Sequence, residues 1–280
     1  MRDSVDGLVL LEEKTGNHDK ILTVLSARDG TFRMMAKGVR SKNHRLASIC
    51  CLFSYANFEY YKKKETRWLA DGVSIRQFRH LTSDADGASL AAYVLQIANE
   101  ITGSEVEAGE ILRTTLNILH AIDQRLKPMS QIKAAYELFA VRAAGMSPDL
   151  SGCHACGEQL PDRGWFDVMN GHFFCEDCFR KKQGGLPIPE EDALRTRNIF
   201  CPIDSSALAA MRYLEAAPPT RLLAFGLSDE ESMRLLSNVA ETFLIHHLER
   251  GFSALQSYYS AKDLDQYAQH YRKNTDNAGI

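Results

Sequence analysis

The sequence predicts an α+β protein with several domains, in which a small β-barrel is followed by an α-helical part with an inserted four-cysteine module. Three observations lead to this prediction. Short apolar runs separated by turn residues fill the first 80 positions, and apolar residues at three-and-four spacing begin near position 83. Two C-x-x-C pairs then interrupt the helical pattern after position 150. A chain of 280 residues is long enough for two or three domains.

Residues 1–80 are expected to form the barrel, because they contain five short runs of β character. The predicted strands are Val5–Leu11, Lys20–Ser26, Thr31–Lys37, Phe53–Tyr61 and Arg67–Ile75. Turn residues such as Asp29-Gly30 separate the first three runs. The polar stretch Gly38–Ser48 is too long for a tight hairpin, so we expect a mobile basic loop between the third and fourth strands.

The remainder is expected to be mainly helical, and helices on both sides of the cysteine module are most simply one bundle. The expected parts are a first helical part at 81–150, the module at 151–184, a second helical part at 185–271 and a disordered tail at 272–280. The longest helix is predicted to begin with Ser228 as its N-cap, three residues before Glu231. Its apolar side is expected to continue through Phe252 and Leu255.

The strongest local signal is a set of four cysteines: Cys153, Cys156, Cys175 and Cys178. A two-residue gap in a tight turn lets two thiolates converge on one ion, and this spacing of two pairs is typical of a tetrahedral zinc site. Four thiolates leave no open position, so we expect one structural Zn²⁺ per chain and no catalytic metal. Free or disulfide-bonded cysteines and a redox C-x-x-C are the alternatives.

Two further expectations concern the surroundings of these cysteines. Aromatic residues between the two pairs are expected to form a small hairpin core, namely Trp165, Phe166, Phe173 and Phe174. The nearby His154 and His172 are treated as bystanders, because four cysteines already complete the metal shell. The other three cysteines, Cys50, Cys51 and Cys201, lack such spacing and are expected to be small buried apolar residues.

Charge is distributed unevenly along the chain, although the net charge is only −3. Residues 1–80 hold 15 Lys and Arg against 9 Asp and Glu, a balance of +6, which leaves −9 for the remainder. A basic part on an acidic chain indicates a polyanionic partner, and DNA is the expected one. The candidate contacts are the clustered cations Arg33, Lys37, Arg40, Lys42, Arg45, Lys62, Lys63 and Lys64. The alternative is a solvated basic loop without a partner.

The sequence lacks the motifs that mark several classes of function. There is no phosphate-binding Walker loop, no G-x-G-x-x-G, no nucleophile elbow and no H-E-x-x-H. No apolar run reaches the length of a membrane span, and the N-terminus lacks the apolar core of a signal peptide. We therefore expect a cytoplasmic protein that is not an enzyme and has no membrane partner. A nucleic-acid-processing enzyme would need a carboxylate cluster that the sequence does not reveal.

Taken in order, these features resemble the bacterial RecO family of recombination mediators. The matching segments are Asp6–Leu10, Asp19–Leu25, Gly30, Ala36–Arg40, Phe139, Gly145, Pro148–Leu150, the first cysteine pair and His247–Arg250 with Phe252. They cover nearly the whole chain. Two departures are the sequence Thr15-Gly16-Asn17 before the second strand and the sparser basic run after Gly38.

The resemblance implies an N-terminal OB-fold, a helical domain and a four-cysteine zinc module. It implies binding of single- and double-stranded DNA, annealing of complementary strands, and the loading of RecA, together with RecR, onto DNA coated by single-strand-binding protein. It also implies binding to the acidic tail of that protein and association with the nucleoid. Lys37 and Arg40 fall in a matching segment and are the implied DNA contacts. The alternative is a zinc-stabilised interaction scaffold without DNA binding of its own.

Overall fold

The computed structural model describes residues 2–64, 66–78, 80–82, 84–159, 161–182, 199–227 and 229–262. Ser228, the predicted N-cap, and the tail expected at 272–280 lie outside these ranges. The chain divides into two compact units, one formed by Met1–Leu126 with the chain from Phe252 onward and the other by Lys127–Gly251. The domain boundaries expected from the sequence stay a prediction.

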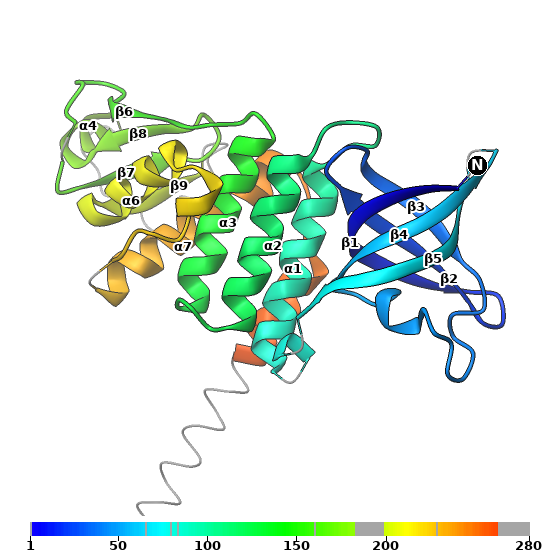
Figure 1. The fold of residues 1–280 in the computed structure, drawn as a ribbon. Coiled ribbons are helices and arrows are strands. Elements are labelled where there is room, and N and C mark those ends of the chain that lie inside the picture. The colour runs from blue at the N-terminus through cyan, green and yellow to red at the C-terminus, as the bar shows by residue number, and fades with distance from the viewer. Residues whose placement is uncertain are drawn as a thin grey trace, which may run out of the picture. The chain divides into compact units, whose positions relative to one another are not determined.

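The first unit begins with five strands that form a closed barrel (Figure 1). They are β1 (Arg2–Thr15), β2 (Asp19–Ser26), β3 (Gly30–Ala36), β4 (Ser54–Lys63) and β5 (Thr66–Gln77). Their order around the barrel is β1-β2-β3-β5-β4, and only β3 and β5 pair in parallel. Alternate residues such as Leu22, Val24, Met34 and Phe58 are fully buried inside. The predicted small barrel of the OB-fold type is therefore confirmed.

The segment between β3 and β4 differs from the mobile loop that was expected. It is a succession of hydrogen-bonded turns that includes the 3₁₀ helix η1 (Ala47–Ile49). The N–H of Gly38 donates to the Asp19 carboxylate at 2.8 Å, and the N–H of Arg40 donates to the His18 carbonyl at 2.9 Å. Apolar side chains of the segment join the barrel core, and these are Val39, Leu46, Ile49 and Cys50. The sequence analysis missed these four core residues because they are separated by polar residues.

Helices complete the first unit. They are η2 (His80–Thr82), α1 (Ala85–Ile101), α2 (Gly109–Asp123) and a helical segment at 253–262. The carboxylate of Asp84 caps α1 by accepting from the N–H of Gly87 at 3.1 Å. Phe252 packs edge-on against Tyr93 of α1, with 5.4 Å between the ring centroids. The α1–α2 connection lies against the β2–β3 turn, where the N–H of Ala108 donates to a barrel carbonyl at 2.8 Å.

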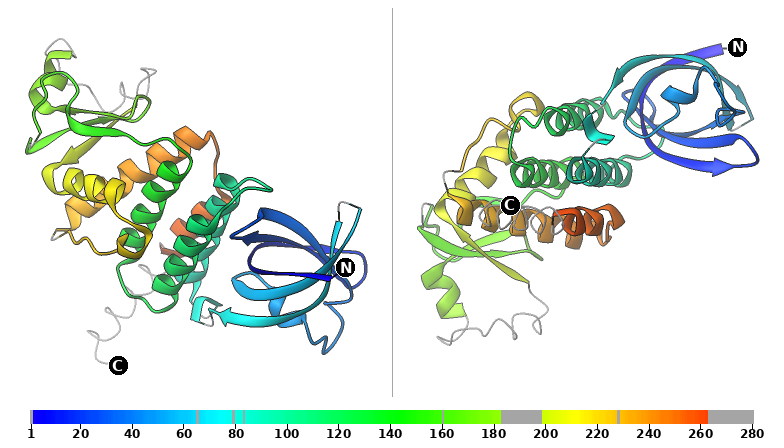
Figure 2. Two further views of the ribbon diagram at one scale, coloured as in Figure 1. Left: turned by 45° about the horizontal axis from the view of Figure 1, so that its top comes forward. Right: turned by 90° about the horizontal axis from the view of Figure 1, so that it is seen from below.

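The second unit combines helices with a four-stranded sheet. Its elements are α3 (Met129–Ala143), β6 (Asp149–Cys153), β7 (Arg163–Asp167), β8 (His172–Cys175), α4 (Glu176–Lys182), β9 (Phe200–Asp204), α6 (Ser205–Ala216), η3 (Pro219–Arg221) and α7 (Glu230–Leu248). The sheet order is β6-β8-β7-β9. Helix α3, which precedes the cysteine module, packs on α6 and α7, which follow it (Figure 2). Phe166 of the sheet packs edge-on against Phe243 of α7.

Helix α7 begins and ends differently from the sequence-based expectation. Its N-cap is Asp229, whose carboxylate accepts from the N–H of Ser232 at 2.6 Å. Glu231 pairs with Arg234 on the same helix and does not close a capping box. The helix ends at Leu248, and Glu249 adopts a left-handed conformation with φ of 50°. The expected continuation of the apolar side through Phe252 is therefore wrong.

Two buried charges on α3, Lys133 and Glu137, and the partly exposed Glu241 on α7 form a cluster in the second unit. The Lys133 ammonium lies 2.8 Å from the Glu137 carboxylate and 2.6 Å from that of Glu241. The side chains of Lys133 and Glu137 are 1% and 0% exposed. Burial of this kind is tolerated only while each charge keeps its partner, so the cluster fixes how the two helices pack.

No helix in the described part of the chain combines the length and hydrophobicity that crossing a membrane requires.

Candidate metal centre and nucleic-acid interface

The four cysteines of the module converge at one end of the second unit's sheet. Cys153 ends β6 and Cys175 ends β8, while Cys156 lies in the turn after β6 and Cys178 in the first turn of α4. A hydrogen bond of 2.8 Å from the N–H of Gly157 to the Cys153 carbonyl closes the first turn. All four sulfur atoms lie within 4.8 Å of one another.

The sulfur geometry fits a tetrahedral metal ion. Metal–sulfur bonds of about 2.3 Å place the corners of a tetrahedron about 3.8 Å apart, and the sulfurs of Cys156 and Cys175 are 3.8 Å apart. A disulfide requires about 2.05 Å, and all four cysteines are free thiols. Four converging thiolates can hold one metal ion with no open coordination position.

Backbone N–H groups around the cluster favour the thiolate form of Cys153, the first of the four cysteines in the sequence. Burial alone would raise the pKa of the Cys153 thiol, but N–H groups of Cys175, Cys156 and Ala155 point at its sulfur and lower the pKa to about 6. The N–H of Cys175 lies 3.3 Å from this sulfur. Because a metal binds thiolate and not thiol, these donors favour metal binding at Cys153. Without a metal, hydrogen bonds with Cys156 and Cys175 raise the pKa of the Cys178 thiol to about 12.

The aromatic core expected for the module is present. Phe166, Phe173 and Phe174 are buried, and Trp165 stacks on Phe179 of α4 at 4.7 Å between centroids. Gly164 is required here, because a Cβ at this position would lie 2.2 Å from the carbonyl oxygen of Phe174. The cysteine ends of the strands are thus fixed by close packing as well as by any metal.

Histidines near the cluster contact each other. His154 and His172 stack with 4.0 Å between their ring centroids. Within the described residues, the metal-ligating group contains the four cysteines and neither histidine.

The cysteines outside the cluster are not all buried, contrary to expectation. Cys50 and Cys201 are buried, and burial raises the pKa of Cys50 to about 12 and that of Cys201 above its usual value. Cys51 is exposed, because it follows η1 where the chain turns back toward β4.

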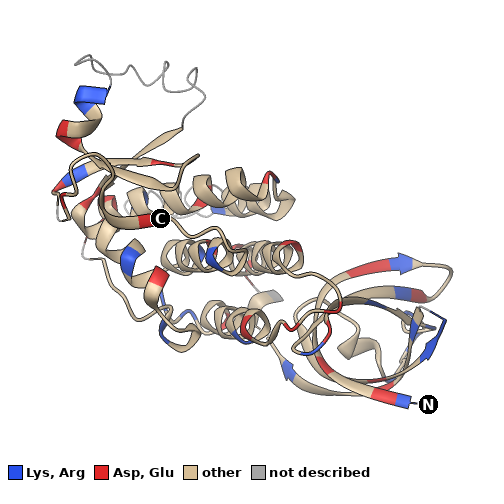
Figure 3. Ribbon diagram, turned by 90° about the horizontal axis from the view of Figure 1, so that it is seen from above, with Lys and Arg blue, Asp and Glu red and all other residues tan. Residues whose placement is uncertain are grey.

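The candidate cations of β3 and the following turns are all exposed on the barrel. Lys37, Arg40 and Lys42 form no ion pair with any described residue. Arg33 pairs with Glu13 of β1, and Arg45 pairs with Asp71 of β5, each at 2.5 Å. Acidic and basic segments both lie along the barrel ribbon (Figure 3).

The second group of candidate cations lies at the β4–β5 hairpin. Lys62 and Lys63 are paired in register with Arg67 and Thr66, and Lys64 begins the turn with a positive φ of 54°. All three lysines are exposed. Their role as DNA contacts stays a prediction.

Arg67, which follows the lysine run in β5, makes contacts within the barrel. Its guanidinium lies 3.9 Å from the centroid of the Phe32 ring and donates to the Asp29 carboxylate at 3.0 Å. The side chain is 15% exposed. Its ion pair links β5 to the β2–β3 turn.

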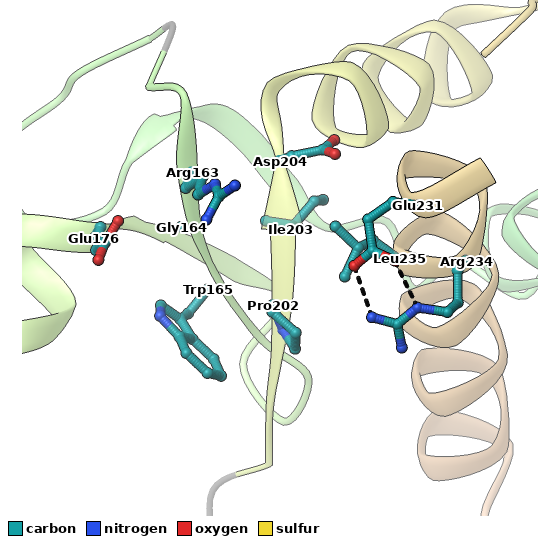
Figure 4. Close-up of a pocket in the computed structure, with 10 residues that line it drawn as sticks. All are labelled: Arg163, Gly164, Trp165, Glu176, Pro202, Ile203, Asp204, Glu231, Arg234 and Leu235. Carbon is teal, nitrogen blue, oxygen red and sulfur yellow. Dashed lines mark hydrogen bonds and ion pairs between the residues drawn. The ribbon is translucent and has the colours of Figure 1, made fainter. Parts of the chain in front are cut away.

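A cavity of about 300 Å³ in the second unit was not expected from the sequence. Its lining comes from β7, β9, α4 and α7 and comprises Arg163, Gly164, Trp165, Glu176, Pro202, Ile203, Asp204, Glu231, Arg234 and Leu235 (Figure 4). Two arginines face three carboxylates there, and Arg234 forms a two-pronged ion pair with Glu231 at 2.7 and 2.9 Å. This balance does not select an anion such as DNA.

Comparison with known proteins gives a consistent result along most of the chain. The model of the recombination protein O N-terminal region matches residues 1–78, and that of the recombination protein O C-terminal region matches residues 82–256. The DNA repair protein RecO of Acetivibrio thermocellus is 25% identical over 249 residues, which cover 89% of this chain and 93% of that protein.

A second relative shows the same extent of similarity. The DNA repair protein RecO of Anaeromyxobacter dehalogenans is 28% identical over 258 residues, covering 90% of this chain and 94% of that protein. The two family models together match the residues that form the barrel, the helices and the cysteine module. The chain therefore belongs to the RecO family of DNA repair proteins.

Proposed function

We propose that this protein binds single- and double-stranded DNA through the barrel and anneals complementary strands. The observation that carries the proposal is the trio Lys37, Arg40 and Lys42, which are exposed on an OB-fold barrel and form no ion pair with any described residue. Unpaired cations can neutralise phosphates without first giving up a carboxylate partner. OB-folds commonly bind oligonucleotides on the face of strands 2 and 3 and in the β1–β2 and β4–β5 loops, and this trio begins directly after β3.

Annealing requires no catalytic residue under this proposal. A cationic surface that holds two strands reduces their mutual repulsion and raises their local concentration. The protein acts in DNA repair as a recombination mediator and not as an enzyme. By family membership, we include RecR, the acidic tail of single-strand-binding protein and, indirectly, RecA among its partners, in the cytoplasm close to the nucleoid.

Equilibrium binding of a labelled single strand, followed by fluorescence anisotropy, tests the proposal. Arg40→Glu/Lys42→Glu should weaken binding of all sequences alike, because phosphate contacts carry no base information. A matched control is Arg180→Glu/Lys181→Glu on α4, which changes the net charge equally in the other unit. Equal binding by the wild type and the barrel variant would contradict the proposal. Absence of binding by the wild type would favour the interaction scaffold.

We further propose that the cysteine cluster holds one structural Zn²⁺. The support is the all-thiolate donor set, the 3.8 Å sulfur separation and the absence of any open ligand position among four converging cysteines. Elemental analysis of purified protein should find one zinc per chain. Cys175→Ser should lower that stoichiometry, whereas Cys51→Ser, outside the cluster, should leave it unchanged. A different metal at full occupancy would overturn the assignment to zinc.

A further inference from the structure

Four side chains form a continuous apolar row across the outside of the barrel. The strand register places Ile21 of β2 beside Met35 of β3, Met35 beside Trp68 of β5, and Trp68 beside Tyr61 of β4. The residues next to them in sequence, Leu22, Met34 and Tyr60, are buried. Because side chains alternate along a strand, the row members face outward.

The row is accessible to a ligand at its aromatic end. Tyr61 is 42% exposed, and Trp68 is partly exposed. The aromatics Phe58 and Tyr60 are buried in the core and cannot contribute. Apolar and aromatic side chains in register on an outer barrel surface require an explanation, since solvent-facing strand positions are usually polar.

Cations border the row on both sides. Arg33 lies two residues before Met35 on β3, Lys37 directly follows β3, and Lys63 lies two residues after Tyr61 on β4. The alternation of strand residues puts Arg33 and Lys63 on the same outer surface as the row. The Lys37 ammonium lies over the Trp68 ring, 4.7 Å from its centroid, which is a cation–π contact.

We propose that Trp68 and Tyr61 stack unpaired nucleotide bases, with the bordering cations on the phosphates, so that this surface selects single-stranded over double-stranded nucleic acid. The proposal rests on the DNA binding proposed above. A single strand has unpaired bases that can stack on the rings and phosphates that the bordering cations can neutralise. A duplex offers its phosphates but keeps its bases stacked. On binding, a base replaces the Lys37 ammonium over the Trp68 ring, and the ammonium moves to a phosphate.

The two tryptophans of the chain make the contact measurable. In a Trp165→Phe background, Trp68 is the sole tryptophan. Titration uses three end-labelled oligonucleotides of equal length: an oligo-dT strand, an abasic strand with the same phosphates, and a duplex. Tryptophan fluorescence reports stacking, and label anisotropy reports binding. We expect quenching only by oligo-dT. It should bind about 5- to 150-fold more tightly than the abasic strand for each stacked base, since stacking on a ring stabilises by about 1–3 kcal/mol per base.

Substitutions on the surface separate stacking from folding. Tyr61→Ala and Trp68→Leu should remove most of the preference for oligo-dT over the abasic strand, whereas Trp68→Phe keeps a ring and should retain it. Val73→Ala is the matched control, because Val73 lies on the same strand, is 71% exposed and stands outside the row. Equal binding of oligo-dT and abasic strands without quenching would overturn the stacking proposal and leave the DNA binding intact. Failure of every oligonucleotide to bind would overturn both.

Discussion

The dependence of DNA affinity on salt should be controlled by two ion pairs on the barrel. Five cations lie between Arg33 and Arg45, and two of them are paired, Arg33 with Glu13 and Arg45 with Asp71. Each phosphate of a single strand that is neutralised contributes about −0.7 to the slope of log K against log salt. The three cations without an ion pair then contribute about −2.1, and all five would contribute about −3.5.

The perturbation is the double variant Glu13→Gln/Asp71→Asn, which removes both carboxylates and keeps the side-chain shapes. It should steepen the slope by about 1.4, since two more guanidinium groups become available to phosphates. The lysines of the β4–β5 hairpin contribute equally in both proteins, so the difference isolates the two pairs. The assay is anisotropy of a labelled oligo-dT strand at several salt concentrations.

A control with two equivalent ion pairs is available in the other unit. Glu176→Gln/Glu231→Gln releases Arg180 and Arg234 and changes the net charge by the same amount. Its slope should equal that of the wild type. The reasoning is refuted if the wild type already has the steeper slope and the double variant does not change it. A flat salt response would show that none of these cations meets a phosphate.

Three further predictions concern stability and the metal. Of the cysteines outside the cluster only Cys51 is exposed, so a thiol reagent at pH 8 should modify one thiol per metal-loaded chain and about five after chelation. Lys133→Met should destabilise the second unit by about 3–5 kcal/mol, measured by urea unfolding, because Glu137 is left buried without its cation. The double variant Lys133→Met/Glu137→Gln should recover part of this stability. An equal loss of stability in both variants would exclude the explanation. Burial would raise the pKa of Asp29, but Arg28 and Arg67 lower it below its usual value. The carboxylate therefore stabilises the fold above about pH 4 and loses this effect as pH falls through its folded pKa. The stability difference between wild type and Asp29→Asn should shrink in acid, and a pH-independent difference would contradict this.

Local patterns in the sequence predicted the barrel and the cysteine cluster because both are encoded by spacing. Alternation along a strand determines which residues are buried, as for Leu22 and Met34. Two C-x-x-C pairs determine a convergent thiolate site once a hairpin joins them. The register between strands is not encoded in this way. The neighbours of Trp68 across three strands became visible only in the structure.

Interactions between distant segments explain the remaining differences. The pairing of Arg33 with Glu13 crosses from β3 to β1 and reduces the number of available cations. Strand β9 joins β7 far along the chain, which no local pattern indicates. The left-handed residue Glu249 ends α7 within an apolar pattern that otherwise continues. In each case the observed structure depends on contacts between distant segments. The local propensity of the segment does not predict it.

Whether DNA is bound by the barrel or by the cysteine module is tested most directly by annealing of complementary oligonucleotides at low salt. The full-length wild type, Arg40→Glu/Lys42→Glu and Cys175→Ser are compared after circular dichroism confirms that each is folded. We expect Cys175→Ser to be less stable yet to accelerate annealing as the wild type does, and the barrel variant to lose most of the acceleration. Loss of annealing in a folded Cys175→Ser protein, with full activity in the barrel variant, would contradict the assignment of DNA binding to the barrel.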